Sequence, residues 1–223
     1  MKIDQRLEQH FPTPVLVRDH EDIDALTAAL KALMDEVRLS ESNAALSADN
    51  TTQGGFQTAA GVDFLDRDHD ALRALKGQII WPAIEGYLSE VLECDPLMTP
   101  VSIASWAVSL GGGDWQAPHF HPKEYTVISG VYYVWVPEVP EPEGCLEFIN
   151  PNLNAVSIGN QASGRLHHPK TGQIILFPPY YMHFVHPLKV AAQRHVIAFD
   201  VRLNPRESDW LVFAAPRNRI PLR

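Results

Sequence analysis

Within residues 116–137 (QAPHFHPKEYTVISGVYYVWVP), two histidines separated by one residue stand immediately before a strongly β-forming run. Alternate side chains of an extended chain lie on one face, so His119 and His121 are expected to point into the same space and to hold one metal ion. A third histidine, His183, follows a proline turn in FPPYYMHFVHP, and Arg194 opens the last β-like run, RHVIAFDVRL. The sequence therefore predicts a metal site of three imidazoles, with a guanidinium nearby that is suited to bind a carboxylate.

The remaining pattern places helices first and strands afterwards. Asp19 is the expected N-cap of a first helix, and a second helical region covers about 68–93, kinked or divided at Pro82. Residues 11–17, broken by two prolines, are typical of an edge strand, and 40–61 read as a polar loop suited to cover a site. Short β-like runs separated by turn residues follow, at 101–110, 127–136, 145–149, 172–177 and 194–203. This order indicates an α+β fold, a double-stranded β-helix (a jelly-roll, cupin-like barrel) with the N-terminal helices packed on the major sheet.

Composition sets outer bounds on the kind of protein. A chain of 223 residues, 45% hydrophobic, is expected to form one domain over 1–223, with mostly helical support in 1–100, a jelly-roll core in 101–204 and a C-terminal tail in 205–223. The net charge of -9 argues against nucleic acid as a partner. Two unrelated cysteines, no signal-peptide pattern and no long apolar run predict a soluble, cytoplasmic protein without membrane contact. A homodimer is the default expectation for assembly.

The histidine and arginine segments resemble the Fe(II)- and 2-oxoglutarate-dependent oxygenases. The likeness is to their prolyl-hydroxylase-like branch and to a bacterial and phage group of such oxygenases, and it covers most of the chain in order and spacing. It implies Fe(II) as cofactor, 2-oxoglutarate as cosubstrate, molecular oxygen as co-reactant and hydroxylation of a small molecule or peptide. The segments that carry it are His119-Phe-His121, Ser129-Gly-Val-Tyr-Tyr133, 172–183 ending in LFPPYYMH, 194–199 and the loop 47–57.

The resemblance also implies roles for individual residues. His119 becomes the first iron ligand and His183 the distal one, while Arg194 becomes the partner of the distal carboxylate of 2-oxoglutarate. Tyr133 and Ser129 would complete the cradle of the cosubstrate. Alternation along the strand supports this arrangement, because four residues are expected on one face: Ser129, Val131, Tyr133 and Trp135.

Two departures from the family pattern bear on these roles. Most members carry a carboxylate where this chain has His121, and three neutral ligands leave the full charge on the metal. A carboxylate from Glu124, Asp114 or Glu147 could instead reach the metal, with His121 behind it. The second departure is Val196, at a place where the family often has a hydroxyl group, which leaves more of the binding to Tyr133.

Other histidines and other functions stay open at this point. His186 and His195 are expected behind the site or on the surface. A cupin-like metalloenzyme without 2-oxoglutarate is a second hypothesis, because Gly113, the histidine pair, Glu124 and Gly130 nearly reproduce a cupin motif. That motif places the glutamate one position later, and it leaves Arg194 without a role. A jelly-roll binding module without catalysis is the third.

Overall fold

Two antiparallel sheets form the body of the protein. The computed structural model describes residues 12–46, 50–59, 63–121, 125–152 and 163–204. The larger sheet has the order β1-β9-β6-β11-β4-β3, with bounds Leu16–Arg18, Ile174–Phe177, Thr126–Trp135, Arg194–Leu203, Val101–Leu110 and Phe56–Gln57. The smaller sheet has the order β2-β5-β10-β7-β8, with bounds Thr52–Gln53, Trp115–His119, His183–Val185, Leu146–Ile149 and Gly164–His167. The expected fold class, a double-stranded β-helix, is confirmed, although the sheets do not close into a barrel.

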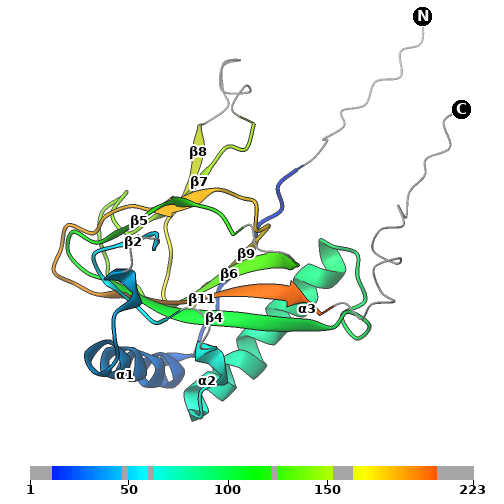
Figure 1. The fold of residues 1–223 in the computed structure, drawn as a ribbon, viewed down its shortest axis with the longest axis horizontal. Helices are drawn as coiled ribbons and strands as arrows, with labels where there is room; N and C mark the ends of the chain where they lie inside the picture. The colour runs from blue at the N-terminus through cyan, green and yellow to red at the C-terminus, as the bar shows by residue number, and fades with distance from the viewer. Residues whose placement is uncertain (1–11, 47–49, 60–62, 122–124, 153–162, 205–223) are drawn as a thin grey trace, which may run out of the picture.

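The helices cover the outer face of the larger sheet (Figure 1). Their apolar stripes pack on that face in one continuous core that includes Leu30, Leu72, Ile84, Ile197 and Phe199. The smaller sheet lies on the opposite side of the larger one from the helices. The helical elements are α1 (Asp24–Ser40), η1 (Ala44–Leu46), η2 (Phe64–Asp66), α2 (Asp70–Leu75), the π-helical segment η3 (Lys76–Ile80) and α3 (Trp81–Glu90).

Alternation along β11 separates the two faces of the larger sheet. Ile197, Phe199 and Val201 face the helices, and every second residue from Arg194 to Asp200 lines the space between the sheets. The same rule holds on the neighbouring strand β6, where Tyr132 joins the helix-side core and Tyr133 the inner cluster. Successive residues of a strand point to opposite faces of the sheet. Burial of the apolar residues against the helices therefore fixes the residues between them, including polar ones, on the inner face.

Several local expectations are corrected. Asp19 is not the N-cap of α1: Ile23 occupies that position without a side-chain cap, and the Asp19 carboxylate accepts a hydrogen bond from Gln173 at 2.7 Å. The second helical region is divided, since η3 separates α2 from α3 and Pro82 lies in the first turn of α3, where its missing N–H costs nothing. The edge strand is confirmed as β1, shifted toward Arg18. The expected tail, 205–223, lies outside the described residues, and no helix in the described part is long and apolar enough to cross a membrane.

Candidate active site

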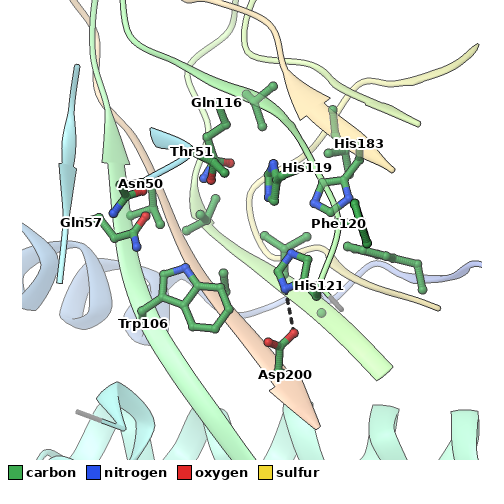
Figure 2. Close-up of a pocket in the computed structure, with 18 of the residues that line it drawn as sticks. Asn50, Thr51, Gln57, Trp106, Gln116, His119, Phe120, His121, His183 and Asp200 are labelled. Carbon is green, nitrogen blue, oxygen red and sulfur yellow. Dashed lines mark hydrogen bonds and ion pairs between the residues drawn. The ribbon is translucent and has the colours of Figure 1, made fainter. Parts of the chain in front are cut away.

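Three histidines converge between the two sheets. His119 ends β5 and pairs in register with His183, which begins β10. His121 lies two residues beyond His119, and one ring nitrogen from each of the three side chains falls within 4.8 Å of the others. Figure 2 shows the three rings turned toward one another at the wall of a cavity. Three nitrogen donors at this spacing fit one transition-metal ion, with coordination positions left open for other ligands.

Each ring is oriented by a hydrogen bond at Nδ1. His119 reaches the carbonyl of Ala117 at 2.7 Å, and His183 reaches the carbonyl of Tyr181 at 2.8 Å. His121 differs, because its Nδ1 meets a carboxylate oxygen of Asp200 at 2.8 Å. With the proton on Nδ1, all three rings donate to these oxygens and keep the lone pair of Nε2 free for a metal.

Burial keeps two of these imidazoles in the neutral form that binds metals. Desolvation lowers the pKa of His119 to about 4. Burial also brings the pKa of His183 well below its ordinary value, and the neighbouring His119 lowers it further. Both rings are therefore neutral at neutral pH, so a metal does not have to displace a proton from either.

Asp200 is a site residue that the sequence did not reveal. It is 1% exposed, and its Oδ1 accepts hydrogen bonds from both His121 and the hydroxyl of Ser129, the latter at 2.9 Å. Its Oδ2 is buried with no hydrogen-bond partner among the described residues. The available signal was its parity with Arg194 along β11, which places both side chains on the inner face of the sheet.

Arg194 and Tyr133 form a second polar group in the same cavity. Both side chains are fully buried, and the guanidinium carbon lies 5.0 Å from the centroid of the tyrosine ring. The Nε and Nη1 atoms of Arg194 and the hydroxyl of Tyr133 have no hydrogen-bond partner in the described part of the chain. Burial raises the pKa of Tyr133, so its hydroxyl remains a donor. Unpaired buried donors around a fixed cation fit an anionic ligand such as a carboxylate.

The cavity that joins the two groups has a volume of about 480 Å³. The histidines, Arg194 and Tyr133 line it, and a wall of neutral polar side chains stands across from the metal site (Figure 2). Gln57 and Gln116 of that wall are linked through the hydroxyl of Thr52, at 2.8 and 3.1 Å. The wall comes largely from the segment 40–61, so the expected position of this segment beside a site is confirmed. The expectation that it is a loop throughout is wrong, because η1, β2 and β3 lie within it.

The structure separates the predicted site residues into those that it brings together and those that it does not. His119, His121, His183, Arg194 and Tyr133 all line the cavity. Ser129 lies close by, but its hydroxyl donates to Asp200, so its contact with a cosubstrate stays a prediction.

The alternative carboxylates do not replace His121 in the described residues. Asp114 accepts a hydrogen bond from the backbone N–H of Gly111 at 2.7 Å, and Glu147 pairs with His186 at 2.7 Å. Glu124 lies outside the described residues. Asp200, which was not among the candidates, is the carboxylate that stands behind His121.

The expectation for His195 is wrong. This residue is fully buried on the helix side of β11, where its ring contacts Ser109 at 2.7 Å and Asp35 of α1 at 3.3 Å. It is neither on the surface nor behind the metal site, since strand alternation turns it away from Arg194. His186 is partly exposed beside Glu147 and does not line the cavity.

Comparison with known proteins places the β core in a family. Residues 104–200 match the family described as "Putative 2OG-Fe(II) oxygenase". This core is therefore similar in sequence to the Fe(II)- and 2-oxoglutarate-dependent oxygenases. The matched segment contains six residues described above that line the cavity: His119, His121, Tyr133, His183, Arg194 and Asp200. No curated protein sequence matches the chain.

Solved structures of oxygenases share the fold. A prolyl-4-hydroxylase from Pseudomonas putida superposes with a TM-score of 0.61 at 13% identity, over 86% of this chain and 93% of that chain. The viral collagen prolyl hydroxylase of Paramecium Bursaria Chlorella virus-1, in complex with 2-oxoglutarate, gives 0.55 at 15% identity over 84% and 95%. HygX from Streptomyces hygroscopicus, with nickel, 2-oxoglutarate and hygromycin B bound, gives 0.58 at 10% identity over 86% and 84%. At these identities the likeness establishes the fold of this chain and neither its activity nor its substrate.

Proposed function

We propose that His119, His121 and His183 bind Fe(II), and that Arg194 with Tyr133 binds the distal carboxylate of 2-oxoglutarate, so that the protein oxidises an organic substrate in the cavity. One observation supports this function above the others. Arg194 is a fully buried cation with unpaired donors that opens into the same cavity as three imidazoles. A buried charge without a partner is costly, and a carboxylate cosubstrate supplies that partner.

The chain's own residues carry out binding, orientation and exclusion of water. When bound, Fe(II) and 2-oxoglutarate supply the oxidation, in which oxygen is reduced, 2-oxoglutarate becomes succinate and carbon dioxide, and a carbon–hydrogen bond is hydroxylated. The Nδ1 hydrogen bonds keep each histidine ring in the tautomer that leaves Nε2 free for the metal. Arg194 binds the carboxylate of the cosubstrate by paired hydrogen bonds. The apolar side chains Val108, Phe177 and Val196 line the cavity and keep water from the anion.

The substrate is proposed to be a small molecule or a peptide side chain that carries a neutral hydrogen-bonding group. Gln57 lines the cavity away from the histidines, Gln116 lines it from β5, which also carries His119, and Trp106 stacks with His121. Amide groups offer both a donor and an acceptor, so they select neutral polar groups rather than ions. Among the described lining residues, the charged side chains belong to the proposed metal and cosubstrate positions.

An anaerobic titration separates the three functions. Purified protein is loaded with Fe(II) without oxygen, and 2-oxoglutarate is added while the visible spectrum is recorded. A metal-to-ligand charge-transfer band is expected, because the keto-acid chelates the iron; succinate serves as the control, since it fills the Arg194 position without chelation. Iron binding without the band would favour the cupin-like metalloenzyme. Failure to bind iron would favour the binding module.

A further inference from the structure

The carboxylate of Asp200 and the imidazole of His121 form a buried pair at the metal site. We propose that Asp200 is a positioning residue, which fixes His121 with Nε2 toward the metal and places behind that ring the negative charge that three histidine ligands lack. The inference rests on the proposed binding of Fe(II) by the three histidines. The ligands themselves come from β5, β10 and the residues after β5, whereas Asp200 supports one of them from the centre of the larger sheet.

The first support is the difference between His121 and the other two histidines. His119 and His183 each find a carbonyl two residues earlier in the chain, so their orientation is local. His121 lies beyond the end of β5, and its backbone N–H donates to the carbonyl of Pro179 at 2.8 Å. Its ring takes its Nδ1 partner from Asp200, 79 positions further along the chain. The orientation of this ligand therefore depends on a tertiary contact.

The second support is the isolation of the carboxylate. Asp200 is 1% exposed, its Oδ1 accepts from His121 and Ser129, and its Oδ2 has no partner among the described residues. Hydrogen bonds from one imidazole and one hydroxyl compensate a buried carboxylate poorly. A divalent cation on the far side of the imidazole would compensate it through the ring, because a hydrogen bond from a metal-bound histidine to a carboxylate raises the basicity of the ligand.

The third support is the place of the pair in the site. Most oxygenases that this chain resembles have a carboxylate among the ligands, and here His121 stands in its position. Asp200 lines the same cavity as the three histidines, but it does not share their cluster of ligand atoms. The site therefore has a carboxylate, but the ring of His121 stands between this carboxylate and the proposed metal position.

The test measures metal affinity, apart from turnover. Fe(II), and Co(II) as a spectroscopic probe, are titrated into the full-length protein against a competing chelator. Asp200→Ala is expected to weaken both metals about 10- to 100-fold and to change the visible spectrum of the Co(II) form. Asp200→Asn keeps an acceptor for His121 and Ser129 but removes the charge, so its loss is expected to be smaller. A purely structural role would alter the unfolding temperature without changing the Co(II) spectrum.

A matched control comes from another carboxylate–histidine pair, which lies away from the cavity. Asp35→Asn changes the partner of His195 on the helix side of the sheet, and it is expected to leave metal affinity at the wild-type value. Wild-type affinity in Asp200→Asn and Asp200→Ala, or an equal loss in Asp35→Asn, overturns the inference. A loss in Asp200→Ala as complete as that in His183→Ala also overturns it, because Asp200 would then be a ligand. Unchanged affinity in His119→Ala and His183→Ala would instead refute the proposed function itself.

Discussion

The guanidinium of Arg194 lies over the ring of Tyr133, with its carbon 5.0 Å from the ring centroid, and both side chains are buried beside the three histidines. The pairing explains how a cation can remain inside the protein before an anion binds. The ring face offers partial compensation, while Nε and Nη1 keep their hydrogen-bonding capacity for a ligand. The two residues are diagonal neighbours on adjacent strands, since Tyr133 of β6 pairs with Val196, two residues after Arg194 on β11.

Replacing Arg194 is expected to separate cosubstrate binding from metal binding. Arg194→Ala should leave Fe(II) affinity nearly unchanged and weaken 2-oxoglutarate about tenfold to several hundredfold, because hydrogen bonds to charged groups contribute about 1.5–3 kcal/mol each. Arg194→Lys should recover only part of this loss, since an ammonium lacks the planar fork. Titration of 2-oxoglutarate into the iron-loaded variants measures the effect. Equal affinities in Arg194→Ala and wild type would make this arginine structural.

Tyr133→Phe keeps the ring under Arg194 and removes one unpaired hydroxyl. If that hydroxyl donates to the carboxylate of the cosubstrate, 2-oxoglutarate should bind about ten- to a hundredfold more weakly, the range for one hydrogen bond to a charged group. The same anaerobic titration reports it. Tyr132→Phe is the matched control, because Tyr132 lies on the helix side of the same strand and also has a buried hydroxyl without a partner in the described part. A loss of similar size in both variants would argue against the Tyr133 contact.

The site also predicts how a carboxylate at position 121 would behave. His121→Asp is expected to retain metal, because it restores the ligand type that the related oxygenases carry. It also places a second carboxylate toward Asp200, and two like charges in a buried site oppose each other. Adding Asp200→Asn should therefore improve Fe(II) affinity in the His121→Asp background, whereas it weakens affinity in the wild-type background. A double-mutant cycle of Fe(II) affinities measures this coupling, and additive effects would refute it.

Much of the fold could be predicted from the sequence, because its longest strands are buried. The runs 101–110 and 194–203 are strands over their full predicted lengths. The short strand β5 (WQAPH) was missed, since Pro118 cannot donate a hydrogen bond and the other residues are not strong strand formers. Its conformation comes from pairing with β2 and β10, which local propensity does not encode.

The site was predictable where a residue's own segment fixes its place. Tyr133 and Arg194 point inward from the larger sheet, and the histidines come from β5, β10 and the residues after β5. The structure brings all five to one cavity, while their individual roles stay predictions. Asp200 was missed because its contact with His121 depends on how β11 meets a segment 79 positions away in the sequence. His195 was expected behind the site or on the surface because it follows Arg194 in the sequence. Adjacent residues of a strand point to opposite faces, so His195 lies on the helix side instead.

Acid should destabilise the protein through His195. Desolvation lowers the pKa of this buried ring from 6.5 to about 4. Below the unfolded pKa, the unfolded chain takes up a proton that the folded chain does not, so stability is complete above about pH 6.5 and falls toward pH 4. Between about pH 7.5 and about pH 5, His195 alone should remove about 2 kcal/mol from the free energy of unfolding.

Urea unfolding of the metal-free protein at these two pH values checks this expectation. His195→Gln should lose less stability than wild type over the same interval. The other buried histidines, His119 and His183, are present in both proteins, so their contributions cancel in the difference. Equal pH dependence of the two proteins would show that His195 does not remain neutral in the folded state.

Close packing at the centre of the larger sheet makes Gly130 intolerant of a side chain. Gly130 lies opposite Phe199 of β11 and Leu176 of β9, and an added Cβ would clash with the Phe199 ring and lie 2.7 Å from Leu176 Cδ2. Gly130→Ala should therefore lower the free energy of unfolding by about 1–3 kcal/mol, the usual cost of overpacking. Gly77→Ala in η3 is the control, because a Cβ there meets nothing within 4 Å, and a helical alanine should add up to about 1 kcal/mol. Urea midpoints should thus move in opposite directions, and a wild-type midpoint for Gly130→Ala would mean that Phe199 can move away without cost.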